Sequence, residues 1–177
     1  MKKLLLVLLL AFPLLAGNLE LKEGFVAAHT EMLMDSTIDP LNAHVSADMS
    51  IDGDDLLSLK GKIWVEMELF SSDNADRDEH MHEADEATLF PSATYTISSL
   101  TKEKEANAYT IHGSLNFHGQ DKAFMAEAEV IEKDGMITIS SKSSLLVSDY
   151  GVEMPCMVFM CVRDQVDIFA KVVLVRK

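Results

Sequence analysis

Regular alternation of apolar and polar residues recurs along this chain, and it constrains the fold more than any other feature of the sequence. In the segment Lys62–Leu69, every second residue from Ile63 to Leu69 is apolar, and the residues between them are a tryptophan and two glutamates. The segments Ala108–Phe117 and Lys122–Ile131 follow the same period. Successive side chains of an extended strand point to opposite faces, so this pattern predicts half-buried β-strands.

Turn signals separate these segments from one another. Asp52-Gly53 and Asp134-Gly135 are strong hairpin signals because both residue types accept positive φ. The pattern predicts eight strands, near Gly24–Met34, Ala43–Ile51, Gly61–Phe70, Ala93–Leu100, Ala108–Phe117, Lys122–Ile131, Met136–Leu146 and Val162–Val175. Closure into a barrel hides the sheet edges, and about eight strands enclose room for one small ligand. We therefore expect an all-β fold, an antiparallel eight-stranded β-barrel, with a β-sandwich as the alternative.

One segment departs from the alternation. Asp73–Ala87 contains no β-branched residue, and acidic residues fill its beginning. Asp73 can cap a helix, and acids in the first turn favour the helix dipole, so we expect a short surface helix between two strands. His80 and Glu83 can share one face of that helix, but no third ligand is evident, and we predict no metal site.

The first 17 residues have the three parts of a secretory signal peptide. Lys2 and Lys3 form a positive end, Leu4–Phe12 is apolar, and Ala16 and Gly17 are small residues at a cleavage site. The apolar run is shorter than the roughly 20 residues of a membrane-spanning helix. We therefore expect an exported protein with a signal peptide at 1–17 and one domain at 18–177, not membrane-spanning after cleavage; an uncleaved membrane anchor is the alternative.

The mature chain is strongly acidic. Loss of Lys2 and Lys3 takes the formal net charge from −14 to −16. Such a surface repels phosphate backbones, which argues against nucleic acid as a partner, while a homodimer is compatible with the sequence. The sequence has no nucleophile elbow, zincin helix or phosphate loop, so we predict neither enzymatic activity nor a cofactor.

A sulfur-rich segment near the end of the chain has three interpretations. In a straight strand Cys156 and Cys161 would face opposite sides, but Pro155 indicates a turn that permits a disulfide. Flexible methionines can instead line an apolar lumen. Soft sulfur ligands at this density also suit Cu(I). The residues concerned are Met154, Cys156, Met157, Met160 and Cys161.

Four short motifs resemble, in the same order, those of the YceI-like lipid-binding family. Arg77-Asp78-Glu79-His80-Met81, followed by Phe90-Pro91, resembles the family's RDxHL and YP signature. The stretch 113–119 is similar to its GxLTIHG hairpin. Asp149-Tyr150-Gly151 resembles its late turn, and the stretch 164–168 its closing DEVxI strand. The family's early Gly-rich strand pair is not recognisable here, and the segment before Pro91 is shorter.

The resemblance implies a lipocalin-like barrel that holds a long amphiphilic lipid, such as a polyisoprenoid, fatty acid or fatty amide, in the periplasm. Arg77 and His80 can then contact a lipid head group, or serve structure alone by pairing with carboxylates and packing the helix on the barrel rim. A Cu(I)-handling protein is the alternative function. The apolar residues expected to face the lumen are Ile63, Val65, Met67, Leu69, Tyr95, Ile97, Tyr109, Ile111, Leu115, Phe117 and Phe124.

Overall fold

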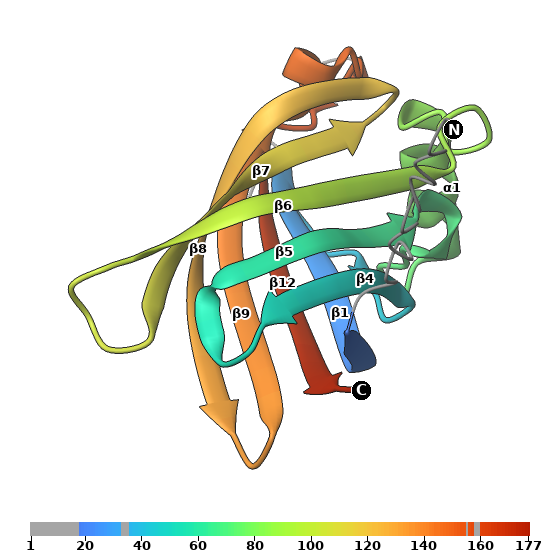
Figure 1. Ribbon diagram of the computed structural model, residues 1–177. Coiled ribbons are helices and arrows are strands. Elements are labelled where there is room, and N and C mark those ends of the chain that lie inside the picture. Colours follow the sequence, from blue (N-terminus) through green and yellow to red (C-terminus); the bar gives the residue numbers. More distant parts are fainter. Residues whose placement is uncertain (1–17, 33–35, 155, 158–159) are drawn as a thin grey trace, which may run out of the picture.

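The computed structural model describes residues 18–32, 36–154, 156–157 and 160–177. The predicted signal peptide at 1–17 lies outside these ranges. The described chain is mostly β structure, wound into a closed antiparallel barrel with an α-helix beside it (Figure 1). Within the described part, no helix has both the length and the apolar character needed to cross a membrane.

Eight long strands form the barrel. They are β1 (Leu19–Met32), β4 (Val45–Asp52), β5 (Asp55–Glu66), β6 (Ser92–Lys102), β7 (Ala108–Phe117), β8 (Gln120–Lys133), β9 (Met136–Leu146) and β12 (Gln165–Arg176). Each strand pairs with the next in this order, and β12 pairs back with β1 to close the ring. The expected eight-stranded barrel is therefore confirmed, and the sandwich alternative is wrong.

The seam between β1 and β4 is the least paired part of the ring. These strands share one residue pair, Leu19 with Met49, whereas β1 pairs with β12 from Leu19 to His29. Two short strands that the sequence did not predict, β2 (Ser36–Ile38) and β3 (Leu41–Asn42), pair with β1 further along. β3 pairs with β1 at Val26 and Ala27, so this side of β1 is covered by short stretches of pairing with β4, β3 and β2.

The turns and bends use residues suited to them. Asp134 and Gly135 have φ of 54° and 76°, which confirms the turn predicted between β8 and β9. Gly113 in β7 permits a close approach of β6, because a Cβ atom there would lie 2.1 Å from the carbonyl oxygen of Thr96. A larger residue at this position would push the two strands apart.

Packed side chains fill one end of the barrel. Burial of each large apolar side chain there stabilises the fold by about 1.5–3 kcal/mol. The buried members of this cluster are Leu19, Met49, Ile51, Leu59, Ile97, Leu100, Tyr109, Ile111, Ala128, Val130, Ile137, Ile139, Val172 and Leu174. A second buried cluster lies toward the other end and includes Val65, Phe117 and Tyr150.

The predicted helix is α1 (Ala75–Ala84), which lies beside the barrel between β5 and β6 in the chain (Figure 1). The sequence suggested Asp73 as its N-cap, but the N-cap is Asn74. The Asn74 side chain accepts a hydrogen bond of 3.0 Å from the backbone N–H of Arg77. Asp73 has a φ of 59° and belongs to the turn before the cap.

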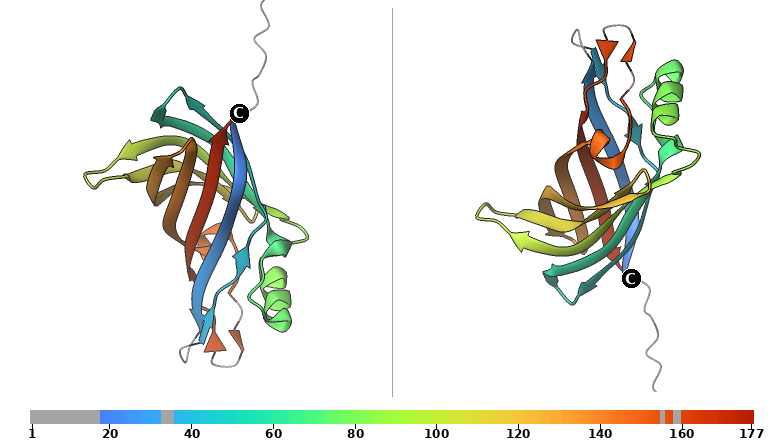
Figure 2. Two further views of the ribbon diagram at one scale, coloured as in Figure 1. Left: turned by 90° about the horizontal axis from the view of Figure 1, so that it is seen from below. Right: turned by 90° about the horizontal axis from the view of Figure 1, so that it is seen from above.

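A small hairpin of β10 (Cys156–Met157) and β11 (Met160–Cys161) follows β9. Both views in Figure 2 place this hairpin and α1 at the same end of the barrel, with the C-terminus at the opposite end. The filled end of the barrel includes Leu174, close to the C-terminus. The end that carries α1 and the hairpin is therefore the open end.

Candidate functional site

A cavity of about 760 Å³ lies inside the barrel and reaches the end that carries α1. Its floor includes Ile97, Ile111 and Val172 from the packed cluster below. Small-molecule sites in proteins commonly have volumes of about 300–1,000 Å³ and predominantly apolar walls. This cavity has both properties.

Nine of the eleven residues expected in the lumen line this cavity: Ile63, Val65, Met67, Tyr95, Ile97, Ile111, Leu115, Phe117 and Phe124. They come from β5, β6, β7 and β8 and the turn after β5, so the alternating pattern placed their side chains on the correct face. Whether they contact a lipid stays a prediction.

The other two expected residues lie elsewhere. β5 ends at Glu66, and a 3₁₀ helix, η1 (Met67–Leu69), follows. The strand alternation stops there, so Leu69 is 41% exposed and outside the cavity wall. Tyr109 is buried in the packed cluster beneath the cavity and does not line it.

Sequence reasoning missed the cavity residues contributed by β1, β9 and β12. A bulge between Leu21 and Glu23 shifts the alternation of β1, which hides the inward positions of Val26 and Ala28. In β9 the inward Ser141 breaks the apolar pattern. Further lining residues that were missed are Thr30, Trp64, Ser143, Leu145, Val166, Ile168, Ala170 and Val172.

Two aromatic rings organise the wall of the cavity between β6 and β8. The Tyr95 and Phe124 rings pack edge to face with centroids 5.5 Å apart. The Tyr95 hydroxyl lies 3.1 Å from the carbonyl oxygen of Ile111, to which it can donate. Burial raises the pKa of Tyr95 to about 12, so its hydroxyl stays neutral and the wall carries no charge here.

The charged and ionisable residues of the cavity, apart from Tyr95, gather at its mouth. α1 and the residue after it contribute Arg77, His80, Glu83 and Asp85, and the segment after β9 contributes Glu153. The Arg77 guanidinium donates a hydrogen bond of 3.1 Å to the carbonyl oxygen of Thr37 in β2, and so ties α1 to the rim. This hydrogen bond supports a structural role for Arg77 at the barrel rim.

His118, in the turn between β7 and β8, connects three parts of this end. Its Nδ1 lies 3.0 Å from the carbonyl oxygen of Tyr150, and its Nε2 lies 2.9 Å from a carboxylate oxygen of Glu86. Both partners are acceptors, so only the imidazolium donates both hydrogen bonds. The Phe90 ring packs against it at 4.2 Å between centroids. His118 thus holds the segment after α1 against the barrel.

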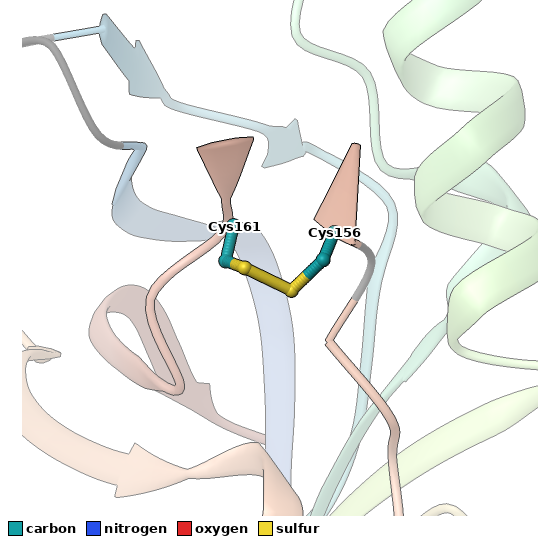
Figure 3. The surroundings of a disulfide bond; sticks show 2 residues. All are labelled: Cys156 and Cys161. Carbon is teal, nitrogen blue, oxygen red and sulfur yellow. A yellow bond between two sulfur atoms is a disulfide. The ribbon is translucent and has the colours of Figure 1, made fainter. Parts of the chain in front are cut away.

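The two cysteines form a disulfide across the β10–β11 hairpin (Figure 3). Cys156 and Cys161 are directly paired across the two strands, so of the three interpretations of this segment the structure shows the disulfide. Of the sulfur-rich segment, Met154 lines the cavity. Pro155 lies outside the described residues. In this form the sulfur atoms are bonded to each other and offer no thiolate to Cu(I).

Among the described residues, no group of three or more His, Cys, Asp or Glu side chains is arranged to hold a metal ion. His80 and Glu83 both border the cavity, but they form no such group with a third ligand among these residues. The copper and helix-metal hypotheses thus gain no support from the geometry.

Comparison with known proteins agrees with this geometry. The crystal structure of Burkholderia cenocepacia BcnA is similar with a TM-score of 0.74 and 17% identity, covering 85% of this chain and 95% of that one. A polyisoprenoid binding domain from Saccharophagus degradans, implicated in plant cell wall breakdown, has a TM-score of 0.70 and 11% identity, covering 90% and 99%. A Campylobacter jejuni YceI protein has a TM-score of 0.68 and 20% identity, covering 82% and 88%.

At these identities the structural similarity establishes the fold alone. No curated protein matches the chain. The family model of the YceI-like domain matches residues 18–174, which is nearly the whole described chain and includes seven barrel strands and most of β12. The chain therefore belongs to the YceI-like family.

Proposed function

We propose that this chain is an exported binding protein that holds the apolar tail of a long amphiphilic lipid inside its barrel. The observation that carries the proposal is the cavity of about 760 Å³, which has an apolar wall and floor and polar residues only near its mouth and on β9. An amphiphile has the same arrangement, with an apolar tail and a polar head at one end.

The energetics of tail burial favour this use. Each CH₂ group removed from water contributes about 0.8 kcal/mol, so a long acyl or isoprenoid chain binds firmly with few polar contacts. Side chains such as Ile63, Leu115 and Phe124 offer the tail an apolar surface from three different strands. The similar Saccharophagus degradans domain is described as binding polyisoprenoid, which supports the same ligand class for this chain.

Export is supported by two independent features. The first 17 residues have the composition of a signal peptide, and the periplasm is the compartment that the family resemblance favours. The Cys156–Cys161 disulfide suits an oxidising compartment. We propose a binding role in preference to catalysis because the wall around the tail offers apolar packing surface.

The test is to purify the mature protein gently and record its native mass spectrum, followed by organic extraction of whatever it carries. We expect an added mass that extraction removes and that lipid analysis assigns to an amphiphile. Binding of a fluorescent fatty acid and of a polyprenol by the extracted protein should then be saturable. An absence of both co-purified lipid and saturable binding would overturn the proposal.

A further inference from the structure

One carboxyl group, that of Asp85, borders the cavity without a hydrogen-bond or ion-pair partner among the described residues. Asp85 is the C-cap residue of α1 and lines the cavity wall. Its backbone N–H bonds to the carbonyl oxygen of Met81, but within the described residues its side chain has no hydrogen-bond or ion-pair partner. The described residues contain no fully buried side-chain oxygen that lacks a hydrogen bond, so the Asp85 carboxylate is accessible from the cavity, where a ligand can reach it.

The electrostatic surroundings of Asp85 disfavour its negative charge. Burial raises the pKa of Asp85 to about 6, although His118 and His82 act in the opposite direction. The carbonyl end of α1 adds partial negative charge at the same place, where cations are stabilised. A bound cation would relieve both effects, because an ammonium donates charge-assisted hydrogen bonds to a carboxylate.

The other charged groups at the mouth also favour a cation over an anion. The cavity is lined by three acids, Glu83, Asp85 and Glu153, against one guanidinium, that of Arg77. Arg77 is exposed and donates to the Thr37 carbonyl. An anionic head group would therefore meet net repulsion here.

Several titratable or charged groups surround Asp85. They are Arg77, His80, His82 and Glu83 from α1, Glu86 after it, His118 from the β7–β8 turn, and Glu153 after β9.

We propose that Asp85 binds the head group of the ligand, and that this head group is a cation, as in a long-chain primary amine whose tail occupies the cavity. This inference rests on the proposed function, since it requires a tail in the barrel. It narrows the ligand class from any amphiphile to one that carries a cationic hydrogen-bond donor next to its apolar chain.

The test compares three probes with the same chain: dodecylamine, dodecanol and dodecanoate, each below its critical micelle concentration. Their affinities are measured by displacement of the neutral fluorophore N-phenyl-1-naphthylamine from the extracted protein at pH 7.5. We expect the amine to bind about tenfold more tightly than the alcohol, which corresponds to one charge-assisted contact, and the carboxylate to bind most weakly.

The variant Asp85→Asn keeps the shape of the side chain and removes its charge. It should lose the preference for the amine and keep the affinity for the alcohol. Glu79→Gln is the matched control, because Glu79 is exposed on the same helix outside the cavity lining and its loss removes the same charge. This control should bind all three probes as the unmodified protein does.

The pH dependence gives a second readout. Lowering the pH from 7.5 to 5 protonates Asp85 while the amine keeps its charge, so the preference for the amine should fall severalfold. The same pH change in Asp85→Asn isolates the part due to His118, His82 and the other titratable groups. Equal affinities for the three probes, or an amine preference that survives in Asp85→Asn, would overturn the head-group inference and leave tail binding intact. Failure of the fluorophore and all three probes to bind would overturn the proposed function itself.

Discussion

Neighbouring side chains on β7 show how the barrel separates its inside from its outside. Ile111 is 2% exposed and lines the cavity. His112, the next residue, points to the other face, where its Nε2 lies 3.1 Å from the hydroxyl of Thr101 on β6. The same chemical change at these two positions should therefore have very different consequences.

Ile111→Asp should abolish tail binding and lower the free energy of unfolding by about 3 kcal/mol or more, because it removes a buried side chain and places a carboxyl in an apolar wall. His112→Asp should change that free energy by less than about 0.5 kcal/mol. Urea unfolding and fluorescent fatty-acid binding, measured on both variants, check the expectation. Equal tolerance at the two positions would mean that the inward face is misassigned.

Asp85 makes stability depend on pH in a direction opposite to that of an ordinary ion-paired carboxylate. Its pKa rises from 3.8 in the unfolded chain to about 6 in the fold because of burial. Above about pH 6 the carboxyl is charged in both the folded and the unfolded state, so burial of the charge lowers the free energy of unfolding by its full amount. Below about pH 4 the carboxyl is protonated in both states, and this destabilisation disappears.

Asp85→Asn should therefore raise the free energy of unfolding at pH 8 by about 2–3 kcal/mol in the ligand-free protein, and by little at pH 4. The difference between variant and unmodified protein should develop between pH 4 and pH 6. Urea unfolding at several pH values measures it, with Glu79→Gln as the exposed control. A constant difference across this range would contradict the placement of Asp85.

At the scale of elements, α1 and the β10–β11 hairpin both lie at the open end of the barrel (Figure 2). They are attached in different ways. α1 is tied to the rim by Arg77 and, through the segment after it, by the contact of His118 with Glu86. The hairpin carries its own cross-link, and its first residue, Cys156, is exposed.

Removal of the disulfide should therefore act locally. The double variant Cys156→Ser/Cys161→Ser closes no loop, and the five-residue separation of the cysteines limits the loss to about 2 kcal/mol or less. We expect tail affinity to stay within a few-fold of the original. Thermal unfolding with and without reductant checks this, and the double variant should be insensitive to reductant. Loss of the barrel on reduction would show that the hairpin supports the whole fold.

At the scale of the whole molecule, the proposed export predicts where the mature chain begins. The barrel begins at β1, whose first residue Leu19 already pairs with Arg176 of β12. Cleavage after Ala16 or Gly17 leaves this pair intact. We expect the protein recovered from the periplasm of an expressing bacterium to start at Gly17 or Asn18, as measured by intact mass. A full-length mass in that fraction would contradict cleavage of a signal peptide.

Local signals account for most of the strands. The predicted β7 and β9 match the structure at both ends, because clear alternation and turn residues define them. The strand predicted at Gly61–Phe70 begins and ends too late: β5 starts at Asp55, and the chain turns into η1 after Glu66. The alternation of apolar and polar residues continues through η1 to Leu69, so no local pattern marked the end of the strand at Glu66.

The sequence by itself determined that eight long strands and a short helix form, and it identified nine of the cavity residues, because side-chain alternation and turn conformation are properties of neighbouring residues. Tertiary structure alone decided the pairing of β1 with β12 and the inward face of β1, since pairing across the length of the chain depends on the whole ring. It also decided the environment of Asp85. A carboxyl at a helix end is ordinarily solvated, and only the packing of α1 on the barrel places this one beside an apolar cavity.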